Sequence, residues 1–114
     1  MSFLKCAAAL ALLAAAGLGL AHADPAVTGR WAADPSACSS FARSPLVVTG
    51  HALRWHEDAC RIARTYKTGD TVHIQAKCWT GSGERSIPVS LRPHGGLLAV
   101  TWNRARRGDL RRCR

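Results

Sequence analysis

Acidic side chains are scarce in this sequence, whose 114 residues include 7 Asp and Glu against 16 Lys and Arg, a formal net charge of +9. The only adjacent carboxylates, Glu57 and Asp58, fall in a predicted turn. The chain also lacks the G-x-S-x-G, H-E-x-x-H and glycine-rich phosphate-loop patterns of known enzyme classes. Gly81-Ser82-Gly83 precedes no predicted helix, so it indicates a hairpin loop rather than a nucleophile elbow. We therefore expect no enzyme and no catalytic residues.

Closely spaced metal ligands are missing as well. No two cysteines form a C-x-x-C pair. His51 and His56 fall on opposite faces of one predicted strand, and His73 and His94 belong to other elements. Because a tetrahedral zinc site needs three or four convergent ligands, the sequence predicts no metal site, and it indicates no cofactor.

Long apolar runs are limited to one, from Cys6 to Ala21, which follows Lys5 and ends in the small-x-small pattern Ala21-His22-Ala23. This arrangement predicts a secretory signal peptide over residues 1–23, cleaved near Ala23, and hence a periplasmic or extracellular protein. A membrane anchor is the alternative, but the run is short, rich in alanine and not followed by a stop-transfer charge cluster. No cysteine follows the cleavage site, which disfavours a lipoprotein.

The remaining residues, 24–114, are predicted to form a single domain with no transmembrane segment. Cleavage removes Cys6, and an even number of cysteines in a short exported chain predicts two disulfides, each adding about 2–4 kcal/mol. The direction of the predicted strands favours Cys38–Cys60 with Cys78–Cys113. The main alternative is Cys60–Cys78 with Cys38–Cys113.

The segment from Leu53 to Cys78 carries the clearest secondary-structure pattern. Between Thr71 and Trp79, apolar and polar residues alternate with a period of two, which is typical of a half-buried strand. A turn at residues 67–70 connects this strand to the one before it. The inner face is then expected to contain Leu53, Trp55, Cys60, Ile62, Val72, Ile74 and Cys78.

Three details of this region are also predicted. A two-residue turn at Glu57-Asp58 would place Trp55 opposite Cys60. Tyr66 would share the inner face with Cys60. Arg64 interrupts the pattern, so we expect it near an open end of the sheet.

The rest of the chain continues the meander. Asp34 and Pro35 predict a helix start, with the helix reaching about Ala42. A hairpin around Thr49-Gly50 would match Leu46 with Leu53, and Pro88 places its strand at an edge or an imperfect seam. The other strands are expected over residues 27–31, 45–49, 52–56, 85–92, 97–103 and 109–113. The predicted fold is all-β, a small antiparallel up-and-down meander or barrel of seven to eight strands with one short helical segment, stapled by two disulfides.

The tripeptide Gly29-Arg30-Trp31 is similar to the G-x-W with which lipocalins and the small periplasmic calycin-type protease inhibitors begin. The resemblance implies an up-and-down barrel with Trp31 closing one end. It also implies an alternative function, a protease inhibitor whose segment Asp24-Pro25-Ala26-Val27 enters a protease cleft. The chain further resembles short secreted bacterial proteins with the same G-x-W…C…C…C layout, and that likeness implies no function.

Positive charge gathers near the C-terminus. Guanidinium groups bind phosphate and carboxylate with two parallel hydrogen bonds, so the cluster predicts binding to anionic lipid head groups, acidic polysaccharide, extracellular nucleic acid or an acidic protein face. A solvated basic tail and structural ion pairing are the alternatives. Trp79 has outward parity, and as an exposed aromatic it would anchor a partner unless it folds over the barrel as a lid. The predicted binding residues are Arg104, Arg106, Arg107, Arg111, Arg112, Arg114 and Trp79.

A small apolar ligand inside the barrel is a further option. It is limited by size, because a barrel of about eight short strands is filled by its own side chains.

Overall fold

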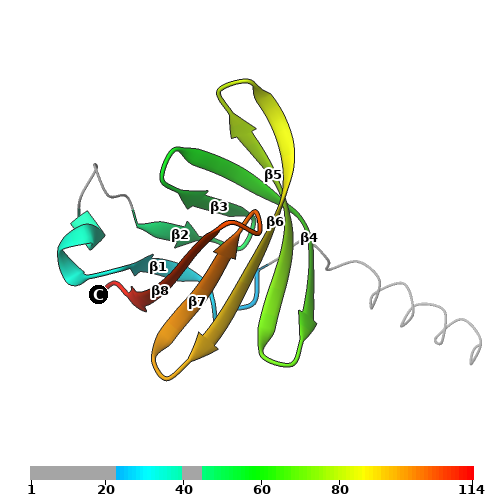
Figure 1. Cartoon of the computed structure of the whole chain (residues 1–114). Helices are drawn as coiled ribbons and strands as arrows, with labels where there is room; N and C mark the ends of the chain where they lie inside the picture. Colours follow the sequence, from blue (N-terminus) through cyan, green and yellow to red (C-terminus); the bar gives the residue numbers. More distant parts are fainter. Residues whose placement is uncertain (1–22, 40–44) are drawn as a thin grey trace, which may run out of the picture.

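The computed structural model describes residues 23–39 and 45–114, which form a closed antiparallel barrel of eight strands (Figure 1). Each strand pairs with the next, and β8 pairs back with β1. This confirms the all-β meander predicted from the sequence. The elements are β1 (Gly29–Ala32), the 3-10 helix η1 (Pro35–Ser39), β2 (Leu46–Val48), β3 (Ala52–Trp55), β4 (Asp58–Thr68), β5 (Thr71–Thr80), β6 (Gly83–His94), β7 (Leu97–Trp102) and β8 (Arg106–Arg112).

Two predictions reach beyond the described residues. The signal peptide lies outside them except for Ala23, and so does the expected helix end near Ala42. Within them, η1 begins as expected, because the Asp34 carboxylate accepts a hydrogen bond from the Ala37 amide at 3.2 Å. No helix in the described part of the chain is long and apolar enough to cross a bilayer.

The alternating residues fill the inside of the barrel. Every side chain of the predicted inner face except Tyr66 is buried, and Trp31, Trp55 and Trp102 are between 2 and 6% exposed. The edge of the Trp55 ring meets Trp102 at a centroid distance of 5.6 Å, a geometry that aromatic pairs favour. The largest fully buried side chains include Trp102, Leu46, Leu53, Ile74, Leu91 and Leu98.

A β-bulge in β4 corrects the prediction for Tyr66 and Arg64. Ile62 pairs with Ala76, but Arg64 pairs with Gln75, so β4 has one extra residue between them. An extra residue reverses the faces of the strand beyond it. Arg64 is therefore exposed on the outer face rather than near an open end, and Tyr66 points outward instead of inward.

Two hairpin registers differ from the prediction by two residues. Trp55 pairs with Asp58, so the turn contains His56 and Glu57, and His56 adopts a positive φ of 52°. Leu53 pairs with Val48 in the preceding hairpin, not with Leu46. Because a strand repeats every two residues, both shifts leave each side chain on its predicted face.

Pro88 lies in an interior strand, which corrects the expectation of an edge or seam. It pairs with Gln75 of β5, and the β6–β7 ladder begins at the next residue, with Val89 opposite Trp102. The Pro88 carbonyl accepts a hydrogen bond from the Asn103 amide at 2.8 Å. In an antiparallel strand the N and O atoms of one residue point to the same side. The proline nitrogen of Pro88, which has no hydrogen to donate, therefore faces the β7–β8 turn, and no ladder hydrogen bond is lost.

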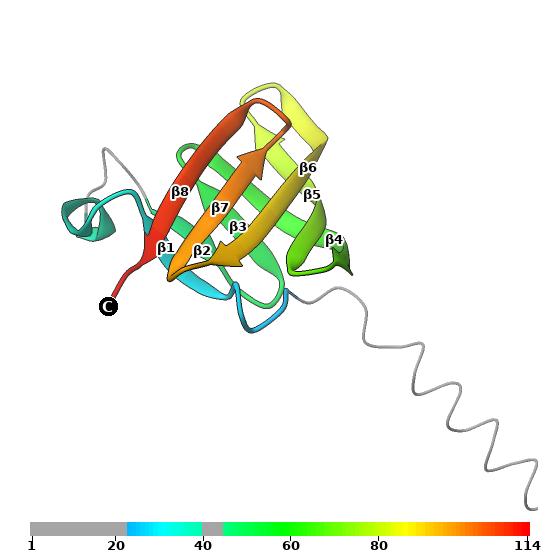
Figure 2. The same ribbon diagram turned by 60° about the horizontal axis from the view of Figure 1, so that its bottom comes forward.

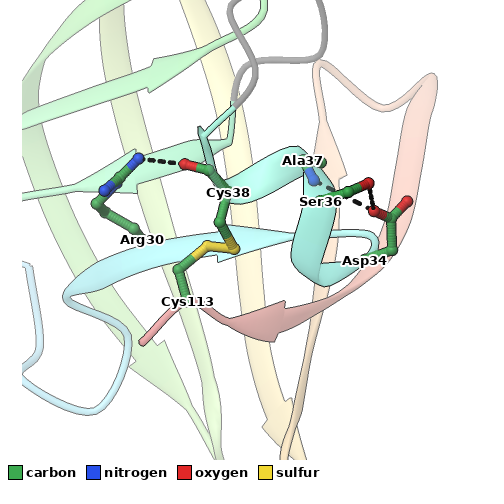
Figure 3. The surroundings of a disulfide bond; sticks show 6 residues. All are labelled: Arg30, Asp34, Ser36, Ala37, Cys38 and Cys113. Atoms are coloured by element: carbon green, nitrogen blue, oxygen red, sulfur yellow. Dashed lines mark hydrogen bonds between the residues drawn. A yellow bond between two sulfur atoms is a disulfide. The ribbon is translucent and has the colours of Figure 1, made fainter.

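The disulfides are Cys60–Cys78 and Cys38–Cys113, so the favoured pairing is wrong and the alternative is confirmed. Cys60 and Cys78 lie directly opposite each other on β4 and β5 inside the barrel. Cys113 continues β8 beside β1, where its amide donates to the Arg30 carbonyl at 2.7 Å. Figure 3 shows η1 placing Cys38 over the same strand, with the Arg30 guanidinium donating to the Cys38 carbonyl.

Candidate functional site

The six C-terminal arginines do not form one cluster. Four of them belong to β8, where Arg106 and Arg112 share the inward parity of the buried Leu110, and Arg107 and Arg111 face outward. Arg104 lies in the preceding turn and Arg114 follows the strand. The segment is thus a strand that closes the barrel and not a loose tail, and alternation sends neighbouring arginines to different surfaces.

Arg112 closes the end of the barrel where residues 23–28 lie, called here the N-terminal end. Its guanidinium lies over the Trp31 ring at 4.2 Å and donates to the carbonyls of Thr28 at 2.7 Å and Ala26 at 3.2 Å. A Cβ at Gly29, where φ is +141°, would come within 2.5 Å of Arg112 Nη1. Glycine is therefore needed for the close approach of Arg112 to the backbone.

The segment from Ala23 to Val27 covers this N-terminal end. Val27 is fully buried, its carbonyl accepts the Trp31 Nε1–H at 3.0 Å, and the Ala23 amide donates to the Gly50 carbonyl at 3.1 Å. Asp24 forms an ion pair with Lys67 at 3.1 Å. Hydrogen bonding from the Ala26 amide and the contact with Lys67 lower the pKa of Asp24 below its usual value.

Arg106 lies at the opposite end of β8, at the Trp55 end of the barrel. Its guanidinium is 5.4 Å from the Trp55 ring centroid and 3.7 Å from the Asp58 carboxylate. Partial burial and the charge of Arg106 lower the pKa of His56, which packs against Trp55.

The Trp55 end remains an open cavity of about 470 Å³, lined in part by Arg85, Arg106 and Trp102. Among the described residues, the buried Trp102 Nε1 has no hydrogen-bond partner.

Three arginines line an open groove of about 720 Å³ beside the Cys38–Cys113 disulfide. Arg111, Arg112 and Arg114 are all exposed, and Ala32, Asp34, Pro35 and Gly96 supply part of its surface. The disulfide fixes the end of β8 against η1, which positions these side chains on ordered backbone. We call this site the C-terminal groove, defined by Arg111, Arg112, Arg114, Cys38 and Cys113.

Trp79 lies on a different surface from the C-terminal groove. It is 66% exposed on the outer face of β5, opposite Ala59 and Glu84. Two strands, β6 and β7, separate β5 from β8 (Figure 2). The outward parity of Trp79 is confirmed, and the ring is not folded over the barrel as a lid.

Sequence reasoning missed the cations around Trp79. Arg61 and Lys77 lie opposite each other on the outer faces of β4 and β5, and Arg64 follows beyond the bulge. The period of two assigns Arg61 and Lys77 to the same outer face as Trp79, but no site was predicted from them. Their nearness to each other depends on the pairing of β4 with β5, and residue spacing alone does not give that register.

The described residues contain no group of three or more His, Cys, Asp and Glu side chains placed to hold a metal ion. Among the described residues, carboxylates pair with basic side chains at several places: Asp24 with Lys67, Asp58 with Arg106, Glu84 with Arg61, and Asp109 with His94. Comparison of the chain with protein-family models, with curated proteins and with solved structures gives no match.

Proposed function

We propose that the protein is an exported binding domain whose C-terminal groove takes an anionic partner through phosphate or carboxylate groups. The observation that carries this proposal is that Arg111, Arg112 and Arg114 all line one open groove of about 720 Å³. Anionic lipid head groups, acidic polysaccharide and an acidic protein face present such groups. The protein acts by binding, without catalysis.

The electrostatics of the groove support this proposal. Arg111 and Arg114 are both exposed. The carboxylates of Asp24, Asp58, Glu84 and Asp109 pair with other basic side chains, and the groove lining contains one carboxylate, that of Asp34, against three arginines. Arg112 is already bound to two backbone carbonyls, but its positive charge still adds to the local potential. The sequence as a whole has more than twice as many basic as acidic side chains, which favours attraction of polyanions.

Export is supported by the two disulfides together with the predicted signal peptide. Disulfides form and persist in oxidising compartments such as the periplasm and the extracellular space. The partner is therefore expected among the anionic molecules of a cell surface or its surroundings.

Protease inhibition is the alternative, and the N-terminal segment bears on it. An inhibitor of this kind would insert Asp24-Pro25-Ala26-Val27 into a protease cleft. In the structure Val27 is buried, and Ala26 and Asp24 are bound to Arg112 and Lys67. Insertion would require the segment to detach from the barrel, so the groove is the better-supported site.

The test compares two variants of equal charge on an acidic polysaccharide column over a salt gradient. Arg111→Gln with Arg114→Gln removes charge from the groove but keeps Arg112, which has a structural role. Arg54→Gln with Arg92→Gln removes the same charge from other exposed positions. We expect the groove variant to elute at clearly lower salt than the control variant. Arginines in contact with the polysaccharide add more to the binding free energy than distant arginines, whose charge is screened by salt.

Equal elution of the two variants would show that only net charge matters and would overturn the proposal. Flotation with anionic phospholipid vesicles, using the same variants, then distinguishes a lipid partner from a polysaccharide.

A further inference from the structure

Two large aromatic side chains of the described residues are strongly exposed, and both lie on the outer face of the β4–β5 hairpin. Tyr66 is 53% exposed and Trp79 is 66% exposed. Large rigid aromatics are common anchors of binding surfaces. Two of them on one face of one hairpin therefore call for an explanation other than chance exposure.

The β4 bulge is what brings Tyr66 to this face. Without the extra residue after Ile62, Tyr66 would have kept the inward parity of Cys60. Bulges commonly redirect side chains next to functional sites. Tyr66 then stacks on His73 at a centroid distance of 4.7 Å and an interplanar angle of 13°, and His73 is held by a 2.6 Å hydrogen bond to Thr68 Oγ1. The two rings form a preorganised stack, called here the platform, in which each ring covers one face of the other and leaves the opposite face free.

Cations fill the space between the platform and Trp79. In the β4–β5 register Arg61 lies directly opposite Lys77, and Arg64 lies directly opposite Gln75. Glu84 contacts Arg61 at 3.3 Å, an exposed contact that solvent screens strongly. From His73 to Trp79 the strand rises by about 20 Å. We call this surface the hairpin strip, and it comprises Arg61, Arg64, Tyr66, His73, Lys77 and Trp79.

A shallow depression adjoins the platform. It has a volume of about 190 Å³ and is lined by Tyr66, His73, Gln75, Pro88 and Ser90, with Arg104 also contributing. Its floor consists of small or uncharged side chains from β5 and β6. A flat ring can lie here beside Tyr66, with the Arg104 guanidinium within reach of an attached anionic group.

We propose that the hairpin strip binds single-stranded nucleic acid. Exposed aromatic rings stack on unpaired bases, while basic side chains between them follow the phosphates. A duplex presents no free base faces to Tyr66 and Trp79, so single strands are preferred. An acidic polysaccharide would also satisfy the cations, and the test below therefore includes it as a competing partner. The length of the strip, about 20 Å, corresponds to the short end of the range of about 4–16 nucleotides that single OB-fold domains cover.

This site is separate from the C-terminal groove, and neither proposal depends on the other. Trp79 and Tyr66 lie on β5 and β4, and the groove arginines lie at the end of β8. Loss of groove binding in Arg111→Gln with Arg114→Gln would leave the strip intact. The same double variant therefore serves as a control for the strip.

The test is fluorescence anisotropy of a labelled single-stranded oligodeoxythymidine of about 12 nucleotides, titrated with the purified protein carrying both disulfides. Trp79→Ala and Tyr66→Ala are each expected to weaken binding at least about fivefold, because base stacking is lost. Trp79→Phe and Tyr66→Phe keep a ring and should retain most of the affinity. Thermal unfolding checks that every variant is folded. We expect all of them to fold, because Tyr66 and Trp79 are exposed and contribute little to the core.

A second measurement separates stacking from charge. Lys77→Gln should reduce the slope of log K against log salt by about 0.7, the value for one phosphate contact on a single strand. Arg92→Gln removes the same charge outside the strip and should leave the slope nearly unchanged, as should the groove double variant. Alanine variants that bind like the unmodified protein, duplex bound as tightly as single strand, or binding of acidic polysaccharide without binding of the oligonucleotide would each overturn the proposal.

Discussion

Each end of the barrel contains an arginine beside a tryptophan, and the two pairs have different roles. At the N-terminal end, Arg112 lies 4.2 Å from the Trp31 ring and binds two backbone carbonyls. At the Trp55 end, Arg106 lies 5.4 Å from the Trp55 ring, near Asp58. Both arginines come from the inward face of β8. The difference arises because the segment from Ala23 to Val27 covers one end, whereas the other remains an open cavity of about 470 Å³.

This comparison shows that residue type alone does not assign a role. A guanidinium over a tryptophan stabilises the fold where backbone carbonyls lie within its reach. Where no backbone carbonyls lie near the guanidinium, its contact with the tryptophan is weak and its charge faces solvent. Substitutions at the two ends can therefore be paired, with each change at the N-terminal end matched to one at the Trp55 end.

Gly29→Ala should have the largest effect. Its Cβ would displace Arg112 Nη1, and alanine strongly disfavours the φ of +141° at this position. We expect a loss of about 3 kcal/mol, measured by chemical denaturation. The control is Gly108→Ala at the Trp55 end, where an added Cβ meets Leu110 at 3.5 Å and Trp55 at 3.8 Å, which are ordinary contacts. If the two substitutions cost the same, the close approach of Arg112 to Gly29 is not a determinant of stability.

Arg112→Ala should come next, with a loss of about 2 kcal/mol, because it removes two charged hydrogen bonds and a cation–π contact. Arg106→Ala removes only a cation–π contact and a long ion pair, so its cost should stay below about 1 kcal/mol. The double variant Gly29→Ala with Arg112→Ala should lose less than the sum of the two single changes, because both disrupt one interaction. Strict additivity would contradict that account.

The smallest effect is expected from the pH response of Asp24. Its pKa is lowered in the folded protein, so its contribution is present above the unfolded value of 3.8 and is lost as the pH falls through and below that value. Asp24→Asn should lower Tm slightly at neutral pH and flatten the fall in Tm between about pH 5 and pH 2. An acid response that is the same in both proteins would assign the effect to other carboxylates.

The sequence predicted the faces of the barrel better than its register. Period-two alternation placed Trp55 inside and Trp79 outside, and both positions are confirmed. The hairpin registers were wrong because a shift of two residues preserves every face, so hydrophobicity alone cannot detect it. The bulge in β4 was missed for a related reason. Arg64 signalled an irregularity, but one charged residue does not indicate where an extra residue is inserted.

The candidate sites were harder to predict than the fold. Nearby arginines in the sequence suggested one patch, but a strand distributes neighbours to opposite faces and over a length of about 20 Å. The hairpin strip joins Arg61 to Lys77 and Tyr66 to His73 only through the pairing of β4 with β5. The disulfide pairing likewise required the register of β4 with β5 and the position of β8 beside β1.

The seam between β1 and β8 has a consequence for the order in which the domain is built. Trp31 pairs with Arg112, and Cys38 bonds to Cys113, contacts that join opposite ends of the chain. A chain emerging from the ribosome or crossing a membrane lacks this seam until residues 106–113 have been released. Contacts of such long sequence separation require a large loss of loop entropy before they form, and this slows folding. The barrel therefore closes only after the last strand is available, so the first and last segments of the domain reach their final positions together.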